Sequence, residues 1–160
     1  MKKIITSIIC ALPLLGFGQN ILLYNDGAIV KVQAGATLYV QGGIQNTSGG
    51  TIDNDGTIDL EGNFVNAGTW EPSQSNTLRF SGTGNSDVTS GTAVFQKVED
   101  IKTGGGNINL LDNMTIDTNL NFNSAGATRI VTGDFDLILG NTATVTGPDD
   151  DEYVATTGTG

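Results

Sequence analysis

Three pairs of carboxylates offer the most direct opportunity for chemistry in this 160-residue sequence. One residue separates the members of each pair, and on a β-strand such side chains project from the same face about 6–7 Å apart. That separation is compatible with the acid and base carboxylates of a glycoside hydrolase. Lysine and arginine are scarce nearby and nothing else converges on the pairs, so a solvated strand face is the favoured interpretation. The pairs are Asp53 with Asp55, Asp59 with Glu61, and Asp134 with Asp136.

The composition limits other kinds of site. Without histidine, the chain cannot build a Ser–His–Asp triad or a histidine-ligated zinc site. Residues 53–56 resemble a calcium loop, but the positions that should be acidic at its two ends are Thr51 and Gly62. Residues 104–107 lack the aspartate of calcium-binding nonapeptide repeats, and the acidic run 149–152 is more typical of a linker than of a calcium site. We therefore predict no catalytic, cofactor-binding or metal-binding residues.

Two surface patterns suggest binding rather than catalysis. Trp70, Tyr39 and Tyr24 are aromatic side chains of the kind that stack on sugars, although single aromatics on a β-surface more often serve packing. Threonines alternate along residues 142–146, as in the ladders of ice-binding solenoids, but one row does not make an array.

The elements that must position these residues are indicated by a repeat between residues 38 and 82. Apolar side chains alternate with polar ones, as on a strand with one buried face, and the alternation recurs at a fixed step of 20 residues. A glycine follows each apolar pair, where a corner needs a positive φ or a residue without Cβ. Such repetition predicts stacked coils. The matched positions are Leu38, Ile58 and Leu78, then Val40, Leu60 and Phe80, then Gly42, Gly62 and Gly82, with Ile44 and Phe64 and then Asn46 and Asn66 extending the first two copies.

The period loosens after Gly82. Residues 81–91 are rich in glycine and serine and are interpreted as a polar loop. The apolar cluster in 94–101 fits either a short helical turn or a strand with a bulge, and the flanking glycines favour the strand. We predict an all-β fold, a right-handed parallel β-helix or β-solenoid with coils of about 20 residues. A β-sandwich of consecutive hairpins is the alternative, because strands about ten residues apart would also suit it.

The net charge bears on possible partners. Lys and Arg number 7 and Asp and Glu 17, which gives a formal net charge of −10. An acidic chain repels phosphate backbones and anionic lipids, so we expect no nucleic-acid partner and no association with anionic membranes. Hydrophobic residues make up 38%, which suits thin coils with much exposed surface.

The first 18 residues read as a secretory signal peptide. Lys2 and Lys3 precede an apolar stretch, and small residues stand at 16 and 18, where a signal peptidase reads the chain. The apolar stretch is short for a membrane span. Cys10, the only cysteine, lies inside this leader, so the mature chain has no disulfide. We divide the chain into a signal peptide (1–18), a β-solenoid region (19–147), and an acidic linker with the start of a further β-segment (148–160).

Several stretches together resemble the repetitive β-region of large secreted cell-surface proteins of Bacteroidetes-type bacteria. They are 78–84 (LRFSGTG), 95–101 (FQKVEDI), 114–122 (MTIDTNLNF), 132–140 (TGDFDLILG) and 153–160 (YVATTGTG). In that family further β-modules and a C-terminal sorting domain of the type IX secretion system usually follow. The resemblance implies that this chain is an N-terminal fragment of a longer protein with downstream domains.

These observations lead to a functional expectation. We expect a non-enzymatic structural or adhesive scaffold that is secreted to the surface of a Gram-negative bacterium, with extracellular glycans or other surface proteins as partners. The alternative is a carbohydrate-binding or carbohydrate-active β-helix protein.

Overall fold

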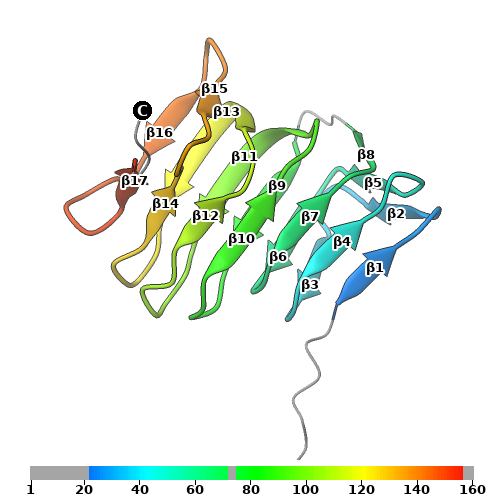
Figure 1. Ribbon diagram of the computed structural model, residues 1–160, viewed down its shortest axis with the longest axis horizontal. Coiled ribbons are helices and arrows are strands. Elements are labelled where there is room, and N and C mark those ends of the chain that lie inside the picture. Colours follow the sequence, from blue (N-terminus) through cyan, green and yellow to red (C-terminus); the bar gives the residue numbers. More distant parts are fainter. Residues whose placement is uncertain (1–21, 72–74, 157–160) are drawn as a thin grey trace, which may run out of the picture.

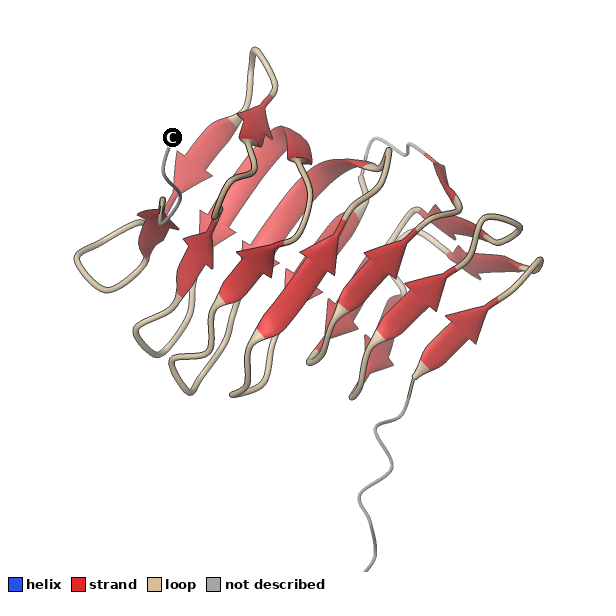
Figure 2. Ribbon diagram, viewed as in Figure 1, coloured by secondary structure: helices blue, strands red, loops and turns tan. Residues whose placement is uncertain are grey.

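The chain folds into a solenoid built from β-strands. The computed structural model describes residues 22–71 and 75–156, so the predicted signal peptide lies outside the described residues. Within these ranges the chain makes about six turns of roughly 22 residues each, and no segment is helical (Figures 1 and 2). All pairing between strands is parallel, which confirms the predicted β-solenoid and excludes a sandwich of antiparallel hairpins.

Three sheets run along the solenoid. Sheet A faces the viewer in Figure 1. Its strands are β1 (Leu23–Asn25), β4 (Ile44–Asn46), β7 (Phe64–Asn66), β10 (Ser86–Thr89), β12 (Ile108–Leu110), β14 (Arg129–Val131) and β17 (Tyr153–Ala155). Sheet B contains β2 (Ile29–Val32), β5 (Thr51–Asn54) and β8 (Thr69–Glu71). Sheet C contains β3 (Thr37–Val40), β6 (Thr57–Leu60), β9 (Thr77–Phe80), β11 (Val94–Asp100), β13 (Met114–Phe122), β15 (Leu137–Leu139) and β16 (Thr144–Thr146).

The predicted 20-residue register is confirmed. Ile58 pairs with Leu38 on one side and with Leu78 on the other. Val40, Leu60 and Phe80 stack in the same way, because equal spacing returns each apolar side chain to the same point of the next turn. Ile58, Leu60, Leu78 and Phe80 are fully buried, so the alternating pattern correctly identifies the inward face.

The later turns join two faces in one strand. The first residues of β11 pair with the first residues of β13, and these in turn pair with β15. The later residues of the two strands pair with β9 and β16, after a register shift between Phe95 and Lys97. The apolar cluster in 94–101 is therefore a bulged strand, as favoured from the sequence, and not a helical turn. Phe95 lies against Trp70 of β8, with ring centroids 5.0 Å apart, so this half of β11 continues the face of sheet B.

One sequence interpretation is wrong. The sequence predicts a loop at residues 81–91, but these residues contain β10, whose Ser86 and Val88 are both buried. The alternation of apolar residues that predicts a strand is missing here, because Val88 is the only apolar residue that faces inward from β10. The other inward residue is Ser86, whose hydroxyl accepts a hydrogen bond from Lys102 Nζ at 2.9 Å. The acidic stretch predicted to be a linker leads directly into β17, which pairs with β14.

Asparagines form a ladder inside one corner of the solenoid. The amide of Asn25 donates to the carbonyl oxygen of Asn46, and the amide of Asn46 donates to that of Asn66, both at 2.8 Å. All three side chains are buried, and Asn66 also donates to the backbone carbonyl of Ser90 at 3.2 Å. The ladder satisfies polar groups where the chain turns from sheet A to sheet B, because each turn supplies the partner for the next.

Two glycines of the repeat meet the predicted needs of a corner. A Cβ on Gly62 would lie 2.5 Å from the carbonyl oxygen of Gly42, so the close stacking of these corners excludes a side chain. Gly82 has φ +76°, which L-residues rarely adopt.

Candidate functional site

The first carboxylate pair is held by a lysine. Lys31 Nζ lies 2.5 Å from Asp53 Oδ2 and 3.3 Å from Asp55 Oδ2. These hydrogen bonds raise the pKa of Lys31 above its ordinary value, because they stabilise the ammonium form. The arrangement joins one turn to the next on an exposed face.

The second pair also contacts neighbouring turns. Ser81 Oγ donates to Asp59 Oδ1 at 2.6 Å, and the Tyr39 hydroxyl donates to Glu61 Oε1. The bond to Glu61 raises the pKa of Tyr39, since ionisation would break it. Each carboxylate therefore has its own partner on another turn, which differs from two carboxylates converging on a shared substrate.

The remaining acidic groups differ from the predicted strand pair. Asp134 lies in a turn and Asp136 in the segment before β15, and both are exposed. In the acidic run, Asp149 Oδ1 accepts hydrogen bonds from the backbone N–H groups of Asp151 and Glu152, both at 2.8 Å. This run therefore forms a tight turn that leads into β17.

A line of charged and polar groups crosses the outer face of sheet C. Arg79 lies between two carboxylates, with Nε 2.6 Å from Glu99 Oε2 and Nη1 3.7 Å from Asp59 Oδ2. Asn121 continues the line by donating to Glu99 Oε1 at 3.2 Å, and Thr146 donates to Asn121 Oδ1 at 2.8 Å. The parallel register places these side chains on consecutive turns, so the line binds successive turns together.

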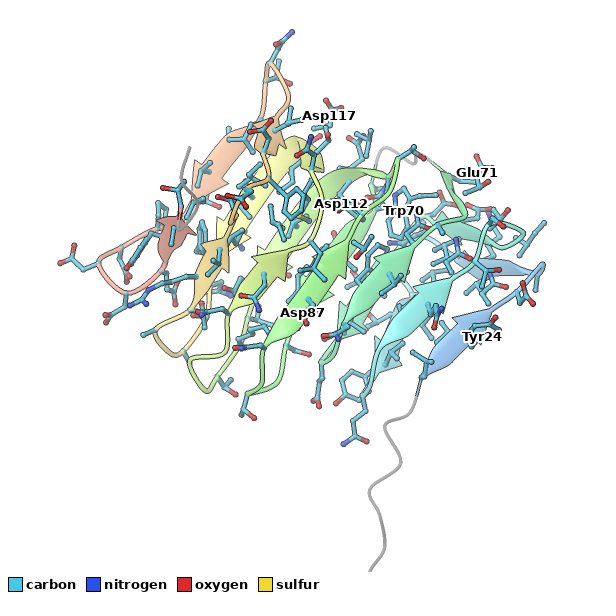
Figure 3. The ribbon with its side chains drawn as sticks, viewed as in Figure 1. Tyr24, Trp70, Glu71, Asp87, Asp112 and Asp117 are labelled. Carbon is cyan, nitrogen blue, oxygen red and sulfur yellow. The ribbon has the colours of Figure 1, made fainter. Side chains whose placement is uncertain are left out.

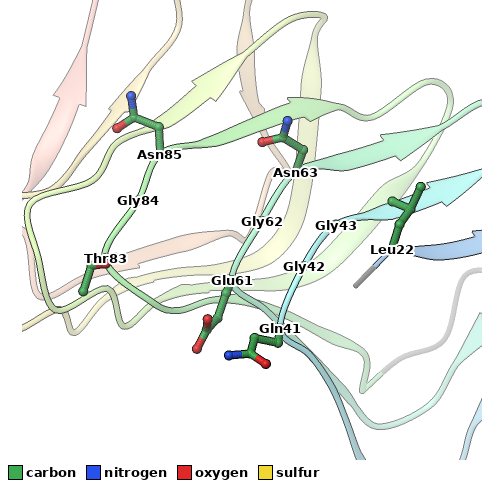
Figure 4. Close-up of a pocket in the computed structure, with 10 residues that line it drawn as sticks. All are labelled: Leu22, Gln41, Gly42, Gly43, Glu61, Gly62, Asn63, Thr83, Gly84 and Asn85. Carbon is green, nitrogen blue, oxygen red and sulfur yellow. The ribbon is translucent and has the colours of Figure 1, made fainter. Parts of the chain in front are cut away.

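A surface hollow lies at the corner between sheets C and A. Its volume is about 540 Å³. Three consecutive corner segments run side by side along it (Figure 4). The side chains of Gln41 and Glu61 project on one side of these segments, and those of Asn63 and Asn85 on the other. The hollow is lined by Leu22, Gln41, Gly42, Gly43, Glu61, Gly62, Asn63, Thr83, Gly84 and Asn85.

The corner hollow has the chemistry of a polar binding surface. The carbonyl oxygens of the two asparagine side chains are already engaged, with Asn63 Oδ1 accepting from Asp87 N and Asn85 Oδ1 from Asn107 N, both at 2.9 Å. Their amide groups remain oriented as donors, while Glu61 supplies acceptor oxygens. No side chain fills the space above Gly84, because a Cβ there would meet nothing within 4 Å. These groups can exchange hydrogen bonds with a polyhydroxylated ligand, but the hollow holds one carboxylate rather than a catalytic pair.

A buried cation lies behind this corner. Lys102 is fully buried, and its Nζ donates to the backbone carbonyls of Ser81 at 3.1 Å and Gly84 at 2.8 Å as well as to Ser86 Oγ. Desolvation lowers the pKa of Lys102, and the nearby charges of Asp100 and Glu61 oppose that shift. Three acceptors match the three donors of an ammonium group, so the lysine serves to hold the corner.

A second set of buried hydrogen bonds begins at the carboxylate of Asp100, near Lys102. Thr128 Oγ1 donates to Asp100 Oδ2 at 2.6 Å and lies 2.9 Å from Ser124 Oγ. Ser124 Oγ in turn donates to Glu152, which is only 7% exposed. This set connects three turns through polar groups that are satisfied by one another.

The aromatic residues considered for sugar stacking have different environments. Trp70 packs edge-to-face on Phe64 and Phe95, so it belongs to the core (Figure 3). Tyr24 and Tyr39 are more than half exposed on the first turn. Of the alternating threonines, 144 and 146 lie on the outer face of β16 beside asparagines of β13, whereas 142 lies in a turn.

Sequence reasoning missed the corner hollow and Lys102. The hollow had a signal in the repeated glycines, which mark where successive corners stack without side chains between them. Lys102 had none, since a single lysine between polar residues usually lies on the surface.

In the described ranges no group of three or more acidic, histidine or cysteine side chains is placed to hold a metal ion. The described part of the chain also has no helix of the length and hydrophobicity needed to cross a membrane. A scan of protein-family models, a search of curated proteins and a search of solved structures each returned no match.

Proposed function

We propose that this protein is a secreted, non-catalytic scaffold of the bacterial cell surface, with a structural or adhesive role. The observation that supports this most is how its reactive side chains are used. Lys31, Asp59, Glu61, Arg79 and Glu99 each contact a partner on a neighbouring turn. Groups engaged in this way stabilise the stacking of successive turns, as expected of a stalk or spacer.

The sequence features support the cellular setting. The leader-like residues 1–18 and the resemblance to secreted repeat proteins of Bacteroidetes-type bacteria point to export and to a longer native chain. Other surface proteins and glycans are the partners that such a location offers.

The experiment tests location and catalysis together. Protease added to intact host cells is expected to degrade the protein, while a periplasmic marker survives. Purified protein is expected to release no reducing sugar from polysaccharides. Protection on intact cells would contradict surface exposure, and sugar release that Glu61→Gln abolishes would contradict the non-catalytic role.

A second candidate function is carbohydrate binding in the corner hollow. It is favoured by the amide groups of Asn63 and Asn85 and the carboxylate of Glu61, which all line the hollow. Gly84→Leu would place an apolar side chain in the hollow, because Gly84 lines it and a Cβ at that position would meet nothing within 4 Å. Gly49→Leu is the matched control, since its Cβ would make only an ordinary contact of 3.5 Å.

This candidate is tested on a glycan array. A glycan bound by the wild type and by Gly49→Leu, but not by Gly84→Leu, would support binding in the hollow. Equal binding by all three proteins, or by none, would contradict it.

A further inference from the structure

We propose that the N-terminal end of the solenoid is a self-association surface, on which a second copy of this chain docks end to end. The surface, called here the first-turn end, consists of β1, β2 and β3 and the corners between them. Each of these strands is the last in its sheet within the described residues. The open end is therefore an edge of three strands at once.

The backbone of the first-turn end has hydrogen-bonding groups for which residues 22–71 and 75–156 supply no partner. Along β2, the carbonyls of Ala28, which precedes the strand, and of Val32, its last residue, accept hydrogen bonds from the N–H groups of Thr51 and Asp55 on the next turn. Because successive residues of a strand point their backbone groups to opposite sides, Ile29 directs its N–H and C=O toward the open edge. β1 and β3 follow the same rule. Such edges pair readily with another strand.

The first-turn end carries apolar side chains. Leu23, Val30 and Leu38 face the core but are only partly buried, because no turn covers them among the described residues. Two shallow hollows of about 350 and 340 Å³ lie on them. The first turn also exposes four large hydrophobic side chains, Leu22, Tyr24, Ile29 and Tyr39, beside the exposed polar side chains of Lys31, Gln33, Thr37 and Gln41.

The charge distribution allows a second copy to dock on the first-turn end. Residues 22–41 hold one acidic and one basic side chain, so their net charge is zero (1 − 1), whereas residues 42–160 hold 16 acidic and 4 basic ones, a net charge of −12 (4 − 16). Nearly all of the excess negative charge by which two copies repel each other therefore lies outside the first turn. The opposite end, residues 129–156, has a net charge of −5 (1 − 6). The first-turn end thus adds no net charge of its own to the repulsion between two copies.

The shape of the two ends favours contact between like ends. At the far end β17 extends sheet A one strand beyond β15 and β16, so that end is stepped (Figure 1). A copy stacked there in continuous register would need its own β1 in the place that β17 occupies. Contact between two first-turn ends avoids this conflict.

A two-fold arrangement makes the like-ended contact uniform. The chain rises steadily from β1 through β2 to β3, so the three edges lie at increasing heights. A two-fold axis through the middle of the β2 face pairs β2 with its own copy and β1 with the β3 of the other copy. The strand edge that protrudes most on one copy then faces the edge that protrudes least on the other. All three antiparallel strand pairs therefore have the same distance between their strands.

The test measures the dissociation constant of the dimer by sedimentation equilibrium on the mature chain, from Gln19 onward. Ile29→Lys is the test variant, because Ile29 is 72% exposed on β2 and the substitution places a new charge on each copy at the contact. Ile138→Lys is the matched control. It adds the same charge at an exposed isoleucine of β15, on the continuation of the same face at the other end.

The wild type is expected to dimerise, and Ile29→Lys to raise the dissociation constant at least about tenfold, while Ile138→Lys changes it less than about twofold. A second measurement does not depend on the folding of the Ile29 variant. Energy transfer between copies labelled at a cysteine introduced at position 31 is expected to exceed that between copies labelled at a cysteine introduced at position 144. A monomeric wild type would overturn the proposal. So would equal weakening by both variants, no weakening by Ile29→Lys, or stronger energy transfer at position 144.

Discussion

Removing the middle rung of the asparagine ladder is the sharpest test of how this fold is held together. In the variant Asn46→Ala, Asn66 Oδ1 loses the donor at 2.8 Å that is its partner among the described residues. Asn25 loses one bond to Asn46 but keeps its contacts with the carbonyls of Ala28 and Thr51. The backbone carbonyls that Asn46 contacts at 3.3 Å are weaker losses.

These losses set the expected magnitude. A buried acceptor left without a donor costs about 1–3 kcal/mol, and one exchanged hydrogen bond about 0.5–1.5 kcal/mol. Asn46→Ala should therefore lower the free energy of unfolding by about 2–4 kcal/mol. Gln45→Ala is the control, because Gln45 is the exposed neighbour on the same strand and its loss should cost less than about 0.5 kcal/mol.

The assay is urea unfolding followed by tryptophan fluorescence. Trp70 is the only tryptophan of the chain and is 7% exposed in the core, so its emission reports exposure on unfolding. If Asn46→Ala costs no more than Gln45→Ala at an unchanged slope with urea concentration, the buried ladder does not hold the corner and the reasoning is refuted.

Three further predictions test other features of the fold. Leu60→Asp puts a carboxylate at a fully buried position and should lower the free energy of unfolding by more than about 4 kcal/mol; a thermal melting curve like the wild type's would contradict the stacked register. Gly62→Ala should cost about 1–3 kcal/mol because its Cβ meets a backbone oxygen at 2.5 Å, whereas Gly84→Ala should be nearly neutral; equal melting temperatures for the two would refute the close corner stacking. The lowered pKa of Lys102 means that the unfolded chain binds more protons between that pKa and 10.5, so wild-type stability should rise with pH across this window relative to Lys102→Met; no difference in slope would show that Lys102 is not desolvated.

The regular part of the fold was predictable because its signal is repeated. Leu38, Ile58 and Leu78 stand at equal spacing, and equal spacing in a solenoid means direct stacking. The later turns were harder to predict, because insertions change the spacing while the fold absorbs them. The register shift between Phe95 and Lys97 is one such change.

The buried polar contacts could not be predicted from the sequence. Asn46 and Asn66 follow Ile44 and Phe64 in strict alternation, which places them inward, but an asparagine gives no signal of burial unless a partner on the next turn is known. Lys102 is a stronger case, since its acceptors are mostly backbone carbonyls that carry no sequence signature. The corner hollow depends on how three such corners stack, which is a property of the assembled turns.

Cross-turn proximity in solution is the most direct test of the solenoid. Nuclear Overhauser effects from the Ile58 methyl groups are expected to both Leu38 and Leu78, its partners on the turns before and after. Backbone Hα–Hα effects between residues 51–54 and 57–60 would instead indicate an antiparallel hairpin and would contradict parallel stacking.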